Sequence, residues 1–182
     1  EGCGDGDCGA CTVAMIETDA HGQSQYRAVN SCLLPLGALP GREIVTVEGL
    51  AEGERLHPAQ QVMVDGAGSQ CGYCTPGFVM SLFVGTQDGD LSDRCIEGNL
   101  CRCTGYRPIR DAVKQLAALP IVDDRFGAAL QQPRAALASA SSNIIARGHS
   151  APQYDVIGGP HWNRFDNIDR NLFFKNRVTF IS

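Results

Sequence analysis

The sequence lacks the features that define several common protein classes. No apolar run approaches the roughly 18 to 20 residues that a membrane-spanning helix requires, so we expect a soluble chain or one attached only through partners. Lys and Arg are scattered and the formal net charge is −5, which argues against nucleic acid as a partner. There is no phosphate-binding loop of the G-x4-G-K type and no nucleophile elbow. These absences disfavour a membrane span, a nucleic-acid scaffold and the common hydrolase or nucleotide-binding sites.

An even number of cysteines is also missing. The chain has nine cysteines among 182 residues, too few for a small disulfide scaffold, and the odd number disfavours a fully paired extracellular framework. Metal binding is the better interpretation, and a reducing compartment such as the cytoplasm would keep the thiolates available as ligands. The sequence opens at Glu1 without an initiating Met, so we interpret it as N-terminally truncated and draw nothing from the lack of a signal peptide.

The first cysteine set begins in the opening stretch EGCGDGDCGAC, which is too rich in Gly, Asp and Cys to form a helix or a strand. With Cys32 it gives C-x4-C-x2-C followed after twenty residues by a fourth cysteine, the spacing typical of plant-type 2Fe–2S proteins. The glycines permit close backbone approach to a cluster and to its sulfurs. Four thiolates also suit tetrahedral zinc, although zinc ribbons usually present two C-x2-C knuckles and this set has one. The predicted ligands are Cys3, Cys8, Cys11 and Cys32.

The second set is divided between CGYC at 71–74 and CRC at 101–103. Each pair precedes an expected helix start, one at Thr75–Pro76 and one at Pro108. A helix N terminus stabilises negative charge, so both helices can direct this end toward one anionic cofactor. Spacing alone leaves zinc open, and a thioredoxin-like dithiol would need a βαβ context that the sequence does not offer. The predicted ligands are Cys71, Cys74, Cys101 and Cys103.

Hydrophobic periodicity predicts an α+β fold in which a small β-rich half is followed by a small helical half. The stretch from about 120 to 150 is rich in Ala, Ser and Gln and is predicted to be a linker or a surface segment. No recognisable motif occurs in 151–182, and its final RVTFIS is predicted to be either a strand or a tail with no packing partner. The expected elements are strands over 12–18, 25–31 and 42–50, helices over 58–65, 76–85 and 108–119, and a short turn from Ser92 to Glu97.

Taken together, these motifs resemble the iron–sulfur portion of the molybdenum hydroxylases, the family of xanthine dehydrogenase, aldehyde oxidase and the small subunit of carbon monoxide dehydrogenase. The resemblance covers residues 1 to about 119, and it is specific because several motifs occur in a fixed order. It looks closer to the xanthine dehydrogenase type than to the carbon monoxide dehydrogenase branch. In chain order the motifs are EGCGDGDCGACTV, RAVNSCLLPL, TVEGL, HPAQQ, GSQCGYCTPGFVMS and GNLCRCTGYRPI.

The resemblance implies a partial ferredoxin-like β-grasp domain over 1–52 and a helical-bundle domain over 53–120, followed by a linker and unassigned tail over 121–182. Each of the two domains would hold one 2Fe–2S cluster. Electrons would pass from a molybdopterin centre on a partner domain or subunit, through the second cysteine set to the first, and on to FAD on another. Gln70 and Cys103 would lie close to the pterin, and no substrate chemistry would occur on this chain itself.

Three departures from the family pattern qualify this expectation. The chain starts at the first cysteine loop, so part of the β-grasp core is missing. The interval between Cys74 and Cys101 is shorter than usual, in the polar stretch VGTQDGDLSDR, where we expect a trimmed loop to be tolerated. Nothing beyond about Pro133 resembles a flavin domain. A zinc-stabilised binding module and a non-functional gene fragment therefore remain alternatives, and the cytoplasm is the expected location.

A few residues outside the two sets deserve an interpretation. Cys95 stands close to the GNLCRC motif, but its apolar neighbours favour a buried structural cysteine over a ligand. Arg102 and Arg107 flank the second set and are consistent either with offsetting its negative charge or with ordinary solvated side chains. No histidine forms a C-x-H arrangement with a cysteine, so all are expected to be structural or on the surface. They are His21, His57, His149 and His161.

Overall fold

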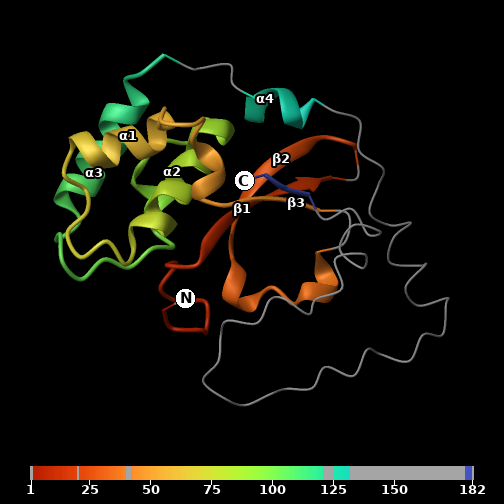
Figure 1. Cartoon of the computed structure of the whole chain (residues 1–182), viewed down its shortest axis with the longest axis horizontal. Helices are drawn as coiled ribbons and strands as arrows, with labels where there is room; N and C mark the ends of the chain where they lie inside the picture. Colours follow the sequence, from red (N-terminus) through yellow and green to blue (C-terminus); the bar gives the residue numbers. More distant parts are fainter. Residues whose placement is uncertain (1, 20, 40–41, 121–124, 132–178, 182) are drawn as a thin grey trace.

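A four-stranded sheet forms one side of the protein and three helices form the other (Figure 1). The computed structural model describes residues 2–19, 21–39, 42–120, 125–131 and 179–181. Strand order in the sheet is β2-β1-β3-β4. The α+β fold class expected from the sequence is therefore confirmed. The described elements are β1 (Thr12–Thr18), β2 (Ser24–Asn30), β3 (Glu43–Val45), α1 (Pro58–Asp65), α2 (Thr75–Asp88), α3 (Arg107–Ala117), α4 (Arg125–Leu130) and β4 (Thr179–Ile181).

The predicted hairpin forms from β1 and β2, which pair antiparallel from Thr12 opposite Asn30 to Thr18 opposite Ser24. Asp19 closes the turn, because its carboxylate accepts hydrogen bonds from the backbone N–H groups of His21 and Gln23 at 2.8 and 2.9 Å. β3 pairs antiparallel with β1, and β4 pairs parallel with β3. The hairpin register determines where the residues that flank it lie, which matters for the first cysteine set.

The third strand is shorter than predicted. Strand structure was expected over 42–50, but β3 ends at Val45 and residues 48–50 form a 3₁₀ turn. The backbone N–H of Gly49 donates to the carbonyl of Thr46 at 3.0 Å, so the chain bends immediately after the strand. The turn directs Leu50 into the core, where it is 2% exposed. Burial of one leucine after a sharp bend cannot be read from an alternating sequence pattern.

The helices begin close to the expected residues. α1 starts at Pro58, where Nδ1 of His57 accepts from the N–H of Ala59 and Gln60 reciprocates by accepting from the N–H of His57. α2 begins one residue earlier than predicted, because Cys74 rather than Thr75 is its N-cap. It also runs through Asp88, so about the first half of the polar stretch VGTQDGDLSDR, which was expected to be a loop, is helical. Gly89, with φ +74°, then ends the helix.

Two segments beyond residue 120 correct or refine the sequence interpretation. Residues 125–130, expected to be linker, form α4, and Phe126 is buried at 2% exposure. A strand at the C-terminal end was one of the two alternatives for RVTFIS, and Thr179–Ile181 does form β4. The rest of the predicted tail, with His149 and His161, lies outside the described residues. In the described ranges no helix is both long and apolar enough to cross a membrane.

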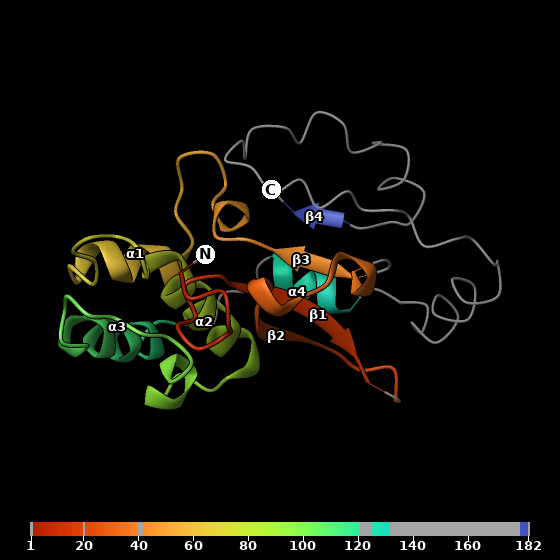
Figure 2. The same ribbon diagram turned by 90° about the horizontal axis from the view of Figure 1, so that it is seen from below.

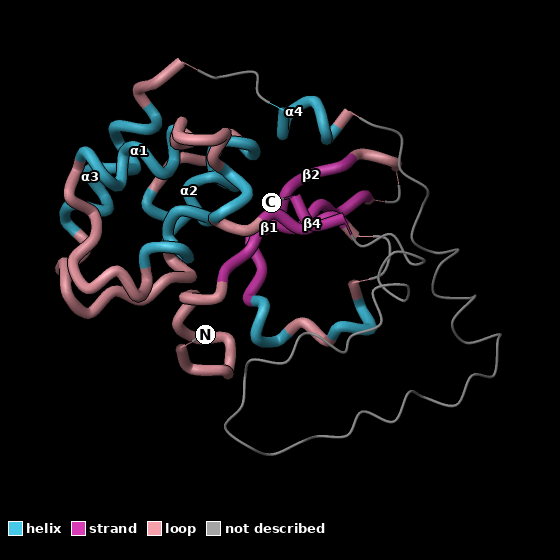
Figure 3. The backbone as a smooth tube through the Cα atoms, viewed as in Figure 1, coloured by secondary structure: helices cyan, strands magenta, loops and turns pink. Residues whose placement is uncertain are grey.

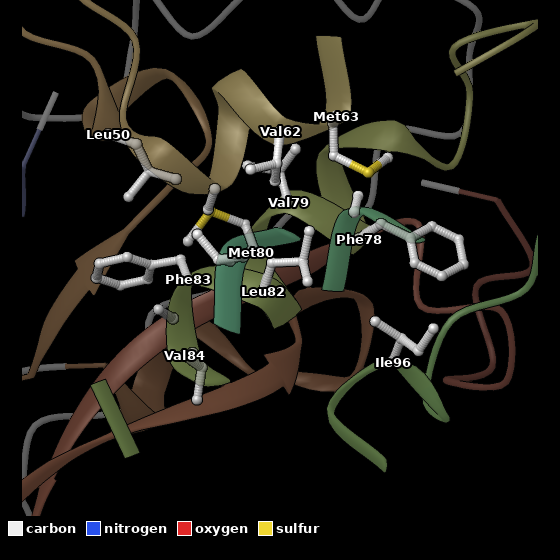
Figure 4. Packing of buried hydrophobic residues seen from close by; sticks show 14 of the residues in the cluster. Leu50, Val62, Met63, Phe78, Val79, Met80, Leu82, Phe83, Val84 and Ile96 are labelled. Carbon is white, nitrogen blue, oxygen red and sulfur yellow. The ribbon is translucent and has the colours of Figure 1, made fainter. Parts of the chain in front are cut away.

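The core lies where α2 packs between the sheet on one side and α1 and α3 on the other (Figures 2 and 3). Every residue of α2 from Gly77 to Gly85 is buried, so the helix is apolar all round rather than on one face. Figure 4 shows its side chains meeting Val62 and Met63 of α1 on one side and Leu50 on another. The same cluster includes Ala14, Tyr26 and Val45 from the strands. One core thus spans both halves of the described fold.

Candidate metal centres

The hairpin brings the first cysteine set together. Cys11 directly precedes β1, and Cys32 lies in the 3₁₀ turn Ser31–Leu33 that directly follows β2. Because the first residue of β1 pairs with the last residue of β2, the two cysteines are neighbours in space, and the N–H of Ser31 donates to the carbonyl of Cys11 at 3.2 Å. The twenty-residue interval in the sequence is therefore the length of one hairpin.

The four thiols of this set contact one another in pairs. The N–H of Cys8 donates to Sγ of Cys3 at 3.4 Å, and the thiols of Cys11 and Cys32 interact closely enough to shift their pKa values. The N–H of Ala10, followed by the contact with Cys3, lowers the pKa of Cys8. Burial opposes ionisation of Cys11, but hydrogen bonds with Cys32 and with the Ser31 side chain together outweigh burial and lower its pKa. The contact with Cys11 raises the pKa of Cys32. Between Cys11 and Cys32, the thiolate of Cys11 is therefore favoured over that of Cys32.

Glycine is required at particular points of this loop. A Cβ atom on Gly2 would lie 2.9 Å from Sγ of Cys8, and one on Gly6 would lie 2.4 Å from the Leu33 side chain. Gly6 also has φ +86°, a conformation that L side chains rarely adopt. Asn30 donates its side-chain amide to the Gly6 carbonyl, which fixes the loop to the end of β2. The glycine content noted in the sequence thus serves close approach of the backbone to the thiols.

The second set assembles from two loops that each lead into a helix. Cys71 and Cys74 directly precede α2, and Cys101 and Cys103 stand a few residues before α3. The thiol of Cys71 interacts with that of Cys103, and the thiol of Cys74 with that of Cys101, closely enough to shift their pKa values. Each pair therefore takes one cysteine from each loop, and the partial positive charge of the α2 N terminus lies directly beside Cys74.

The thiols of the second set also differ in their tendency to ionise. The N–H of Tyr73 lowers the pKa of Cys71, and the contact with Cys71 raises the pKa of Cys103. Burial raises the pKa of Cys74 to about 11. Burial also opposes ionisation of Cys101, but interactions with Thr104, with the backbone of Cys103 and with Cys74 together outweigh it and lower the pKa. Every pair that the two sets form thus contains one cysteine with a lowered pKa.

The paired arrangement fits a binuclear cluster. In the described ranges, no group of three or more His, Cys, Asp or Glu side chains is placed to hold one metal ion. A 2Fe–2S cluster instead takes two thiolates at each of two irons, and N–H groups directed at sulfur help to set its reduction potential. Each set contains two pairs of contacting thiols, and backbone N–H groups lie beside them.

The other residues singled out in the sequence occupy varied positions. Gln70, Arg102 and Arg107 are exposed, and Gln70 directly precedes Cys71. Cys95 packs against the core at intermediate exposure, so it is less buried than the sequence predicted. His57 is buried and caps α1, as expected of a structural histidine.

Sequence reasoning missed one residue that links the two sets. Asn99 is 6% exposed, and its side chain bonds to Gly9 and Thr12 beside the first set and to Ser81 on α2. Its position two residues before Cys101 is the only signal in the sequence, and a single asparagine gives no indication of distant partners.

Comparison with known proteins gives a family match and several relatives for this chain. Residues 46–114 match the family described as [2Fe-2S] binding domain. The chain is 48% identical over 118 residues to xanthine dehydrogenase of Blastobotrys adeninivorans, covering 61% of this chain and 8% of that protein. It is 45% identical over 124 residues to xanthine dehydrogenase 1 of Arabidopsis thaliana, covering 64% of this chain and 9% of that protein. The chain thus spans less than a tenth of the curated relatives it matches.

Two solved structures share the fold. A chain of quinoline 2-oxidoreductase from Pseudomonas putida 86 superposes with a TM-score of 0.54 at 33% identity, covering 64% of this chain and 70% of that one. Aldehyde oxidoreductase from Desulfovibrio gigas gives a TM-score of 0.53 at 36% identity, covering 64% of this chain and 13% of that one. The similarity therefore extends over most of the part of this chain that the structure describes.

Proposed function

Because this chain belongs to the iron–sulfur components of the molybdenum hydroxylases, we propose that it carries two 2Fe–2S clusters and relays electrons between them within a larger oxidoreductase. Electrons would enter from a molybdopterin centre on a partner domain or subunit and leave to FAD on another, as in an enzyme of the xanthine dehydrogenase type. The second cysteine set would receive the electrons and the first would pass them on. The location we propose for the assembled enzyme is the cytoplasm.

The observation that carries this proposal is the pairing of thiols in each set. We assign one iron to Cys3 and Cys8 and a second to Cys11 and Cys32, because these are the thiols in contact. In the second set the corresponding pairs are Cys71 with Cys103 and Cys74 with Cys101. A bound cluster supplies one-electron redox chemistry. The chain supplies thiolates, the N–H groups that bond to sulfur, and the helix N terminus that favours negative charge.

The proposed division of the chain follows the two clusters. Residues 1–52 would form the ferredoxin-like part and 53–120 the helical part, with 121–182 as linker and tail. Cys103 of the second set and Gln70, which directly precedes Cys71, are both exposed. A molybdopterin partner that docks there would therefore meet both side chains. No bond-making step on a substrate is assigned to this chain, and its role is to hold the clusters in place and in order.

Anaerobic reconstitution of the full chain tests the proposal. With iron and sulfide, the protein should become reddish-brown and take up about four iron and four acid-labile sulfide per chain, as two 2Fe–2S clusters require. Reduction should give two distinct EPR signals. Cys32→Ser and Cys103→Ser should each weaken a different signal, whereas the matched variant Cys95→Ser should keep both. A folded chain that binds one cluster or none, or that binds colourless zinc in preference, would overturn the assignment.

A further inference from the structure

Asn99 is a buried side chain whose hydrogen-bonding groups are all used between the two cysteine sets. Its amide nitrogen donates to the carbonyl of Gly9 at 2.9 Å and to Oγ1 of Thr12 at 3.2 Å. Its amide oxygen accepts from the hydroxyl of Ser81 at 2.6 Å. Thr12 in turn donates its hydroxyl to the same Gly9 carbonyl at 2.7 Å. The amide therefore has two donor contacts on one side and one acceptor contact on the other, as a fully satisfied buried amide should.

Each partner of Asn99 belongs to a segment that bears proposed ligands. Gly9 lies between Cys8 and Cys11, and Thr12 follows Cys11. Ser81 is on α2, which begins directly after Cys74, and Asn99 itself stands two residues before Cys101. The side chain therefore ties the first cysteine loop to α2 and to the segment that precedes Cys101.

The backbone reinforces this contact. The N–H of Leu100 donates to the carbonyl of Cys8 at 2.9 Å, so a single hydrogen bond joins a proposed ligand of the first set to the residue before Cys101. Two glycines allow the approach. A Cβ atom on Gly77 would lie 2.1 Å from the Gly9 carbonyl oxygen, and one on Gly9 would lie 2.2 Å from the Gly98 carbonyl oxygen. The atom nearest to each added Cβ belongs to the backbone, which cannot move aside as the end of a flexible side chain could.

We propose that Asn99 is a positioning residue that sets the separation between the two clusters, holding the first cysteine loop against the segment that precedes Cys101. The proposal rests on the proposed function, because it presupposes a cluster in each set. Asn99 ligates nothing and touches no substrate. It acts through the backbone of Gly9 and Cys8, and its loss lets the first loop move away from α2 and the second set without removing any thiolate.

Substitution of Asn99 by alanine in the full reconstituted chain tests the inference. When both clusters are reduced, each is paramagnetic, and the spin–spin interaction between them falls steeply with distance. We expect Asn99→Ala to retain the iron and sulfide content of the wild type but to lose much of the interaction splitting in the EPR spectrum of the doubly reduced protein. Electron exchange between the two clusters, followed after rapid partial reduction, should be slower.

Gln60→Ala is the matched control. Its side chain is a half-buried amide that also joins two backbone groups, accepting from the N–H of His57 at 2.9 Å and donating to the carbonyl of Val47 at 3.0 Å. It lies at the start of α1 and touches neither cysteine set through these bonds, so it should lose stability while keeping the wild-type splitting. An Asn99→Ala protein with two clusters and unchanged splitting would overturn the proposal. A wild-type chain without a second cluster would instead overturn the proposed function.

A second pair of variants decides the matter if Asn99→Ala does not fold. Gly77→Ala improves intrinsic helix propensity within α2, yet its methyl group would press on the Gly9 carbonyl oxygen. Gly98→Ala adds the same methyl group nearby, where it meets nothing within 4 Å. We expect Gly77→Ala to reduce the splitting and Gly98→Ala to preserve it. Equal splitting in the two proteins would show that the approach of these segments does not set the cluster separation.

Discussion

At the scale of the residue, the nine cysteines differ both in their exposure and in their contacts. Eight have another cysteine of their own set as a neighbour, and the spacing of C-x4-C-x2-C with Cys32 allowed the first of these groups to be predicted. The ninth, Cys95, packs beside Leu91 and the loop that follows α2. Burial raises the pKa of Cys95 to about 11, and the carboxylates of Asp90 and Asp93 add to the effect.

This environment predicts slow alkylation of Cys95 in the cluster-loaded protein. At pH 8 a thiol with a pKa of about 11 contains roughly 100-fold less thiolate than one with a pKa of 9, and the thiolate is the nucleophile. The alkylation rate should rise about tenfold per pH unit until the pH approaches 11. Mass spectrometry after iodoacetamide treatment measures the rate, with the urea-unfolded chain as control. Equal rates for folded and unfolded chains at pH 8 would contradict the burial of this thiol.

The same shift predicts a loss of stability in alkali. Because the folded-state pKa is raised above the unfolded value, the contribution is fully present below about pH 9 and is lost as the pH rises through 11. Cys95→Ser should remove this part of the pH dependence. Urea unfolding at pH 8 and pH 10.5 measures it, and an identical pH dependence in the two proteins would show that other groups cause the loss.

At the scale of the element, the strands and helices could be predicted where one local signal dominates. Pro58 and its capping residues determine the start of α1, and the apolar spacing of Ile109, Val113 and Leu116 gives α3, in which all three are buried. The prediction was wrong where tertiary contacts decide. α4 lies in a stretch with the composition of a linker, and it is helical because Phe126 enters an aromatic group with Tyr26, His57 and Phe83.

Phe126→Ala should therefore destabilise the fold. The ring is 2% exposed and lies 4.8 Å from the Phe83 ring, centroid to centroid, in an edge-to-face arrangement. We expect a loss of about 3 to 5 kcal/mol in the free energy of unfolding, as for other buried phenylalanines. Leu119→Ala is the control, since Leu119 is 47% exposed and should change stability by about 0.5 kcal/mol or less. Urea denaturation measures both, and similar small losses would mean that α4 does not contribute to the core.

At the scale of the whole molecule, the two halves share one hydrophobic core. Tyr26 and Val45 from the sheet belong to the same cluster as Phe78 and Ile109 from the helices. α2 is buried on every side because it has the sheet against one face and α1 and α3 against the others (Figure 2). A helix in this position loses part of its covering if either half is absent.

The shared core predicts that the two halves unfold together. Far-UV circular dichroism, which follows mainly the helices, and visible circular dichroism, which follows the clusters, should report coincident transitions in urea. A chain that begins at residue 53 should show no sharp transition, because the strand-facing side of α2 would be in contact with water. Separate transitions in the full chain, or cooperative unfolding of the shortened one, would contradict a common core.

The sequence alone predicted the proposed ligands and determined most of the local elements, because cysteine spacing, glycine content, proline positions and hydrophobic periodicity act over short distances along the chain. It could not determine which thiols pair, since Cys71 contacts Cys103 and Cys74 contacts Cys101 only once α2 and α3 are packed. Nor could it indicate Asn99, whose partners Gly9 and Thr12 lie about 90 residues away. Contacts of that kind depend on how close two backbones can approach, and here Gly9 and Gly77 allow that approach only within the folded core.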